Sequence, residues 1–328
     1  AAVRSRRFEH EALVQQVKAT EARIMAEVYR KYYNALLARE IIAVRRESMA
    51  LLENQLQLAR NRFDAGAGAR FDVLQADVRV ANARPPLIRA ENDYLVAIDD
   101  LRTTLGAVFP DKVTPSDITL HDRWSQPDLS LDLEAAIRQA VEQRPEMQQA
   151  IMAREAAREW VRRISRQRAP RVNFFANYSA ENDRFAAEST TLEGWQAGVS
   201  ASLSIWEGGR IRGEVAQAQS QYDQRKLQEQ TLRLAIELEV RTALTSASEA
   251  SAILEASVQT SDLAAEALRL AENRYAAGAI TQLDVLTSQL ELTQAKLERI
   301  TAERNYAIAV IDLERATGRL IPPTSGVE

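Results

Sequence analysis

The sequence contains the same turn twice, each time between two long helical patterns. It occurs as NRFDAGAGARFDVL from Asn61 to Leu74 and again as NRYAAGAITQLDVL from Asn273 to Leu286. At the shift of 212 residues that aligns these copies (61 to 273), 17 of the 46 positions from 61 to 106 are identical. The sequence therefore indicates an internal duplication, which limits the fold to two copies of one supersecondary unit.

Each copy predicts two antiparallel helices joined by a tight turn. Gly66 and Gly278 follow long runs rich in Ala, Leu, Glu, Arg and Gln, where glycine permits the left-handed backbone that closes a helix. Asp72 and Asp284 stand near the start of the next helix, where a carboxylate faces the positive end of the helix dipole. Two interpretations of these aspartates stay open: a charge that only stabilises the helix start, or part of a charged ring at a pore mouth.

The composition favours long helices. The chain has 328 residues with only 11 Gly and 9 Pro, and apolar residues recur at helical spacings from residue 1 to about 63. About 60 residues at 1.5 Å each make a helix of roughly 90 Å. The net charge of −4 gives no indication of a nucleic-acid partner, and a chain without Cys forms no disulfides. The sequence has no apolar run of about 18 residues, so we expect no transmembrane helix.

Prolines and changes of pattern divide the chain. Pro85 and Pro86 are expected to bend or interrupt the returning helix of the first copy. Pro145 is expected to break the helix that starts near Leu133. We predict a repeat 1 helical hairpin over 1–105, a connection over 106–132, a helix over 133–169, a β-hairpin over 170–207, a repeat 2 helical hairpin over 208–318 and an irregular tail over 319–328.

Residues 171–206 carry the only strong strand pattern. Apolar and polar residues alternate from Val172 to Ser179 and from Trp195 to Ile205. Strands of about 10 residues suit a tilted passage through a bilayer. A soluble hairpin packed on a helix stays open as the alternative. Both interpretations require partner chains, because a lone two-stranded ribbon is marginal in water and its edges must be closed in lipid.

Two tryptophans and a basic stretch lie next to these strands. Trp195 and Trp206 bracket the second strand, as aromatic residues at a membrane interface would. Trp206 could equally pack at the end of a soluble strand. The arginines between 158 and 168 could face lipid phosphates or could simply be solvated.

Nothing in the sequence indicates an enzyme or a cofactor site. His10 and His121 are far apart and lack a partner at helical spacing, so we expect no metal site. The acidic residues are spread along helical faces, and no nucleophile elbow, P-loop or dinucleotide-binding glycine motif is present.

The repeated turn, its spacing and the passage GVSASLSIWEGGRIRGEVAQAQSQY together resemble the TolC family of outer-membrane efflux ducts. The helix start Arg144-Pro145-Glu146 fits the same family. The resemblance covers nearly the whole chain. It implies a mainly α protein of long antiparallel helical hairpins with a transmembrane-type β-hairpin and two structural repeats, assembled as a trimeric α/β barrel.

The same resemblance implies the function and the partners. The protein would be a homotrimeric outer-membrane exit duct with most of each chain in the periplasm, in contact with outer-membrane lipid. Small molecules or polypeptides would pass through it without catalysis, and its helical tips would meet a periplasmic adaptor and an inner-membrane pump or ABC exporter. The alternative is a non-conducting periplasmic scaffold or adaptor built on helical hairpins, although such a protein needs no lipid-facing strand.

The resemblance also selects residues at the tips. Some family members latch the aperture with a tyrosine, an arginine and aspartates. Tyr275, Asp284 and Asp72 match those positions, whereas Ile280 stands at the arginine position, so we expect Arg70 as a substitute. Candidate adaptor contacts at the tips are Gly66, Ala67, Gly278, Ala279, Leu74 and Leu286.

One departure concerns the number of strands. Residue 1 aligns with Gly213, which follows the predicted β-hairpin of the second repeat. The corresponding β-hairpin of the first repeat is therefore missing from this sequence. We therefore expect a truncated or incompletely numbered chain, since three such chains provide too few strands for the family's barrel.

Overall fold

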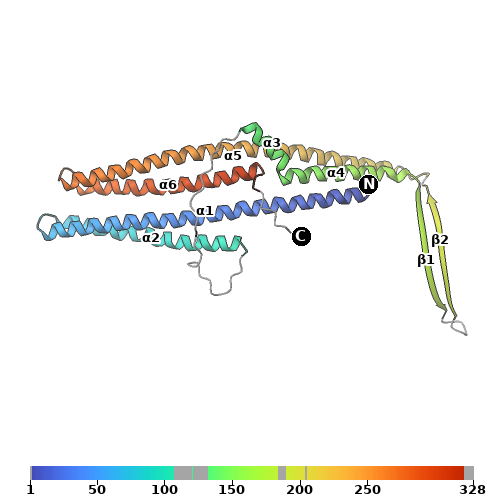
Figure 1. Ribbon diagram of the computed structural model, residues 1–328, viewed down its shortest axis with the longest axis horizontal. Coiled ribbons are helices and arrows are strands. Elements are labelled where there is room, and N and C mark those ends of the chain that lie inside the picture. The colour runs from blue at the N-terminus through green and yellow to red at the C-terminus, as the bar shows by residue number, and fades with distance from the viewer. Residues whose placement is uncertain (1, 107–119, 121–131, 184–189, 204, 321–328) are drawn as a thin grey trace. The chain divides into compact units, whose positions relative to one another are not determined.

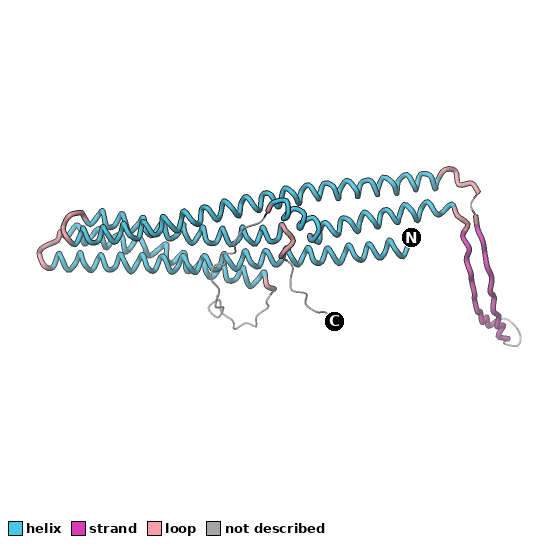
Figure 2. Tube along the Cα trace, turned by 45° about the horizontal axis from the view of Figure 1, so that its top comes forward, coloured by secondary structure: helices cyan, strands magenta, loops and turns pink. Residues whose placement is uncertain are grey.

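The computed structural model describes residues 2–106, 120, 132–183, 190–203 and 205–320. The elements are α1 (Ala2–Asp64), α2 (Arg70–Thr104), α3 (Leu133–Gln143), α4 (Pro145–Ser165), η2 (Arg166–Arg168), β1 (Arg171–Asp183), β2 (Thr190–Ser202), α5 (Arg210–Ala276) and α6 (Gln282–Ala316) (Figures 1 and 2). The predicted fold class is confirmed for the single chain: long helical hairpins with one β-hairpin. Most of the predicted connection over 106–132 and of the predicted tail lies outside the described residues.

The chain forms two compact units. The strand unit comprises Ala1–Gln16 and Pro145–Leu234, and the tip unit comprises Val17–Arg144 and Ala235–Glu328. The strand unit holds the β-hairpin, and the tip unit holds both helix-hairpin turns. No described helix is apolar enough over a sufficient length to cross a membrane.

The helix bounds repeat with the period of the sequence. α2 and α6 each have 35 residues, and the bounds of α6 are those of α2 shifted by 212. α1 ends at Asp64 and α5 at Ala276, again 212 apart. Gly106 and Gly318, which follow the returning helices, both have a positive φ, of 63° and 75°. The duplication seen in the sequence is therefore also a duplication of structure.

Pro85 and Pro86 do not interrupt α2, so that part of the prediction is wrong. Proline removes the N–H that would bond the carbonyl four residues earlier, here those of Ala81 and Asn82. Both residues are exposed, so water can satisfy the freed carbonyls without a break in the helix. The rest of α2 packs on α1, which holds the helix together on both sides of the prolines.

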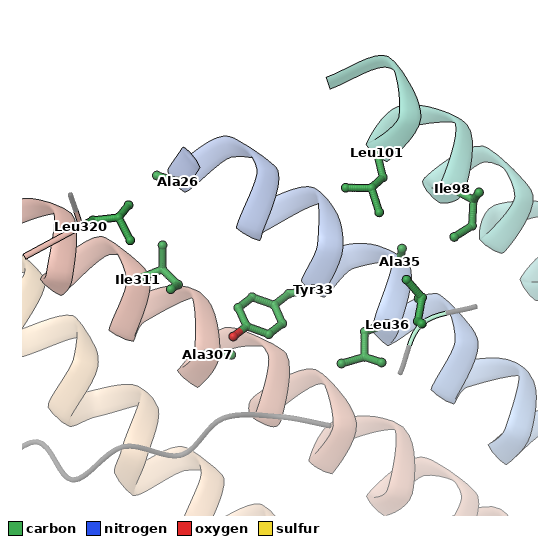
Figure 3. Packing of buried hydrophobic residues seen from close by; sticks show 10 residues of the cluster. Ala26, Tyr33, Ala35, Leu36, Ile98, Leu101, Ala307, Ile311 and Leu320 are labelled. Carbon is green, nitrogen blue, oxygen red and sulfur yellow. The ribbon is translucent and has the colours of Figure 1, made fainter. Parts of the chain in front are cut away.

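The tip unit orders its helices as α5, α6, α1, α2. The largest core cluster joins α1 to both α2 and α6, and Figure 3 shows Tyr33 of α1 reaching toward Ala307 of α6. Two further clusters join α5 to α6. Polar contacts give the same order. Between α6 and α1, Lys296 bonds Glu47 at 2.7 Å and Arg304 bonds Asn34 at 2.6 Å. Between α1 and α2, Lys31 bonds Asp100 at 2.9 Å and Arg46 bonds Glu91 at 2.7 Å. α6 and α1 are thus the inner helices, and α5 and α2 are the edges.

The predicted break at Pro145 is confirmed. Asp132 caps α3 by accepting from the backbone N–H of Ala135 at 3.0 Å, and α3 ends where Arg144 takes an extended backbone, with ψ 127°. This extended residue is what a following proline imposes. Glu239 of α5 then accepts from the buried Arg144 through Oε2 and from Arg315 through Oε1, both at 2.5 Å. The Glu239 carboxylate of α5 therefore links Arg144, the residue between α3 and α4, to α5 and to Arg315 of α6.

The β-hairpin is longer than the alternation predicted. β1 and β2 have 13 residues each, and the register runs from Arg171 opposite Ser202 to Asp183 opposite Thr190. The prediction that the second strand starts at Trp195 and runs to Ile205 is wrong at both ends. Because Thr190–Gly194 pairs with the end of β1, Trp195 lies inside the strand, and Trp206 lies four residues past its end.

The two faces of the β-hairpin differ. One face carries exposed apolar side chains, namely Val172, Phe174, Tyr178, Trp195 and Val199. On the other face Phe175 lies against Gly198, where an added Cβ would come within 2.6 Å of the ring. The predicted one-sided alternation is confirmed, and no other described strand covers the apolar face.

Candidate functional site at the tips of the two helical hairpins

The two tips have the same backbone geometry. Gly66 and Gly278 take the left-handed conformation, with φ of 73° and 71°, as their positions after the helices predicted. Ala67 N–H donates to the Arg62 carbonyl at 2.8 Å, and Ala279 N–H donates to the Arg274 carbonyl at 2.9 Å. These bonds satisfy carbonyls that a helix end would otherwise leave free. Both turns are exposed, so each tip presents backbone and small side chains to solvent.

The two predicted aspartates both act on the helix starts, but to different extents. Asp284 accepts from the Thr281 backbone N–H at 2.8 Å and from the Thr281 hydroxyl at 2.7 Å, both through Oδ2. Asp72 accepts only from the Ala69 N–H, at 3.4 Å, because Ala69 has no hydroxyl. The bonds from the hydroxyl and then the backbone of Thr281 hold the pKa of Asp284 below its usual value. The helix-start interpretation is thus supported at the level of contacts, while Asp284 stays exposed and Asp72 is half-buried.

A contact absent from the sequence-based prediction joins the tips. The guanidinium of Arg62, at the end of α1, lies 4.4 Å from the ring centroid of Tyr275, at the end of α5. Tyr275 also packs on the cluster beneath the second tip. A cation over an aromatic face at this distance is attracted by the ring quadrupole. Arg62 therefore makes the contact with Tyr275, and the described residues offer no ion pair or ring contact for Arg70.

The other predicted tip residues divide by burial. Gly66, Ala67, Gly278 and Ala279 are exposed. Leu74 is 54% exposed, whereas Leu286, its copy in the second repeat, is 1% exposed. The difference follows from the helix order, since α6 lies between two helices and α2 lies at an edge. In the single chain, Leu74 is the one of the two that a partner protein can reach.

The described residues contain no cluster of acidic or histidine side chains that could hold a metal ion. The tips combine a cap, an aromatic contact and exposed small residues, an arrangement that offers surface and charge rather than reactive groups.

Known proteins share the sequence pattern and the fold of this chain. The sequence model of the family "Outer membrane efflux protein" matches residues 1–107 and 136–319. The chain belongs to this family. The match includes both helical hairpins and the β-hairpin.

Similar members of the outer membrane efflux protein family come from several bacteria. The outer membrane efflux protein BepC of Brucella suis is 25% identical over 96% of this chain and 67% of its own length. The outer membrane protein TolC of Escherichia coli is 24% identical over 88% of this chain and 60% of its own length. The alkaline protease secretion protein AprF of Pseudomonas aeruginosa is 26% identical over 90% of this chain and 61% of its own length. The chain thus spans about two thirds or less of these relatives.

Solved structures share the fold of this efflux-family chain. The CmeC outer membrane channel of Campylobacter jejuni superposes with a TM-score of 0.78 at 15% identity, over 97% of this chain and 67% of that one. The resemblance to the TolC family stated from the sequence is confirmed.

The difference between the two caps gives a prediction about pH. Replacing Thr281 with Ala removes the hydroxyl that donates to the Asp284 carboxylate and accepts from the Asp284 backbone N–H. The helix start of α6 then becomes like that of α2, and the pKa of Asp284 rises toward its usual value. A lowered carboxyl pKa stabilises the fold above the unfolded-state pKa, and this contribution is lost as pH falls through the folded-state pKa. We expect Thr281→Ala to have a lower urea midpoint than the unaltered protein at neutral pH. At acid pH the two midpoints should become equal.

The matched control for this measurement is Thr287→Ala in the same helix. The Thr287 hydroxyl donates to the Leu283 carbonyl and, within the part of the chain that the structure describes, bonds no carboxylate, so the effect of Thr287→Ala should not change with pH. If the urea midpoint of Thr281→Ala were lower than that of the unaltered protein by the same amount at neutral and at acid pH, the assigned role of Asp284 would be contradicted.

Proposed function

We propose that the protein is a subunit of an outer-membrane exit duct through which small molecules or polypeptides pass without chemical change. The observation that carries this proposal is one chain with a lipid-compatible strand face in one unit and two solvent-exposed helical tips in the other. A non-conducting periplasmic scaffold or adaptor would have use for the tips but not for the strand face.

The edges of the tip unit support assembly with further copies of the chain. α2 exposes Phe71, Val78 and Val96 by 70%, 58% and 56%, and α5 exposes Leu238 and Leu263 by 66% and 73%. Apolar edges on opposite sides of one layer of helices suit a head-to-tail contact, which makes a closed ring when the rotation closes. We propose a homotrimer, the number of copies that the family resemblance implies.

In this assembly the tips would be the inner opening of the duct. Asp72 and Asp284, repeated around a ring, would favour cations at the mouth. A periplasmic adaptor would contact the exposed tip residues Gly66, Ala67, Gly278, Ala279 and Leu74, and through it an inner-membrane pump or ABC exporter would deliver the substrate. Trp195, which is 80% exposed on the apolar strand face, would lie at the lipid boundary.

The mass of the full-length protein in detergent tests the assembly. We expect light scattering to give the protein mass of three chains, and Leu238→Glu with Leu263→Glu to reduce it to that of one chain. Leu36 is fully buried in the core, so Leu36→Glu should instead unfold the chain and serves as the control for a folding defect. A monomer with native helix content for the unaltered protein would favour the scaffold.

A further inference from the structure

An arginine cluster lies where the helices of the strand unit meet the β-hairpin. We define the junction arginines as Arg163, Arg166, Arg168 and Arg171. They run from the last turn of α4 through η2 to the first residue of β1, and all four are exposed. No Asp or Glu occurs between Glu159 and Glu181 in the sequence. The segment is therefore a concentrated positive charge without nearby carboxylates in sequence.

Two neighbouring arginines of the same unit pair with carboxylates, but the junction arginines do not do so among the described residues. Arg162 pairs with Glu159, and Arg210 pairs with Glu207 and Glu214, both at 2.6 Å. Among the described residues, no carboxylate pairs with a junction arginine; Arg163 instead lies 4.8 Å from the ring centroid of Trp160. Uncompensated charge at this density on an otherwise acidic protein indicates an anionic partner.

The strand register fixes which end of the hairpin this is. Arg171 lies opposite Ser202, so the junction arginines and the segment after β2 flank the same end. The apolar face begins one residue later, at Val172, which is 68% exposed. Beyond Ser202, Ile205 and Trp206 are 94% and 88% exposed. Cations beside a lipid-compatible face, with an exposed tryptophan, are the arrangement found at the boundary between hydrocarbon and headgroups.

A groove beside the cluster offers space for a headgroup. It has a volume of about 470 Å³ between α4 and α5 and is lined by Trp160, Arg163, Ile164 and Gln167 from α4 and η2 and by Glu214 and Gln217 among the residues from α5. Glu214 is already bonded to Arg210. Arg163 and Gln167 thus provide donors at an opening that Trp160 and Ile164 line with apolar surface.

We propose that the junction arginines bind the phosphate groups of anionic phospholipids at the periplasmic surface of the outer membrane, and so fix the depth of the β-hairpin. Guanidinium groups match phosphate geometry through paired N–H donors. This inference rests on the proposed function, because it requires the hairpin to be in a membrane. It goes further by naming a lipid class and the residues that select it.

The test measures which lipids stay with the protein. The full-length protein is reconstituted in vesicles of phosphatidylcholine and phosphatidylglycerol, floated on a density gradient, extracted, and analysed for bound lipid. Each basic residue near an anionic surface favours binding on the order of fivefold at low salt. We expect phosphatidylglycerol to be enriched roughly fivefold over the bulk mixture, and the enrichment to disappear at high salt.

Two variants make the result specific. Arg166→Gln, Arg168→Gln and Arg171→Gln together should return the bound lipid to the bulk ratio. Arg84→Gln, Arg89→Gln and Arg274→Gln together remove three exposed arginines of the tip unit and should leave the enrichment unchanged. Protein that floats without enrichment, or equal loss in both variants, overturns this inference alone. Protein that does not float overturns the proposed function together with it.

Discussion

In the proposed exit duct, the Arg62→Ala variant is expected to open more readily than the unaltered protein. The Arg62–Tyr275 contact joins the ends of α1 and α5 across the two tips. An exposed cation–π contact is worth about 0.5–1 kcal/mol, which is roughly two- to fivefold in an equilibrium between joined and separated tips. If three chains open together, the effect multiplies to roughly ten- to a hundredfold in the ratio of open to closed time. Single-channel recording measures that ratio directly.

Variants of the same pair separate a cation–π contact from an effect of charge at the tips. Tyr275→Phe keeps the aromatic ring and should behave like the unaltered protein, whereas Tyr275→Leu should behave like Arg62→Ala. Arg274, the copy of Arg62 in the second repeat, has no aromatic partner among the described residues, so Arg274→Ala is the matched control. An equal effect of Arg274→Ala would show that tip charge, rather than the contact, governs opening.

A Glu239→Ala protein is expected to lose about 2–3 kcal/mol of unfolding free energy, a value reduced from that of a fully buried pair because Glu239 is one third exposed. The substitution leaves Arg144, whose side chain is 6% exposed, without the carboxylate that it bonds at 2.5 Å. Arg315, bonded to the other oxygen, loses it too. The break at Pro145 would then lose its tie to α5 and α6. Urea unfolding followed by circular dichroism measures the loss.

Glu237 provides the control on the same helix. It pairs with Arg241 at 2.9 Å, and both side chains are well exposed, so Glu237→Ala should cost only about 0–1 kcal/mol. Similar losses for the two variants would mean that the Arg144–Glu239–Arg315 network contributes no more than a surface pair.

Local patterns in the sequence were sufficient for the helices and tips. The glycines after long Ala-rich runs marked both turns, and the duplication fixed their equivalence. Proline chemistry placed the break at Pro145 correctly but overestimated its effect at Pro85 and Pro86. At Pro85 and Pro86 the freed carbonyls belong to the exposed residues Ala81 and Asn82, and this exposure cannot be read from an isolated Pro-Pro pair.

Local sequence patterns could not predict contacts between segments that are far apart in the sequence. Arg62 and Tyr275 belong to different repeats, and nothing in either copy indicates that their side chains meet. Leu74 and Leu286 are identical in the repeat, yet one is exposed and the other buried because α6, unlike α2, has a helix on both sides. The start of β2 was missed because Thr190–Gly194 lacks apolar alternation and is defined by its pairing with β1.

The most direct test of the exit-duct proposal is single-channel recording from the full-length protein in a planar bilayer, beside Asp284→Ala. We expect steady, small, cation-preferring openings, with a weaker preference for cations in Asp284→Ala because one ring of tip charge is removed. Protein that inserts in the bilayer and carries no current, even as Arg62→Ala, would contradict the exit-duct proposal and leave the non-conducting scaffold.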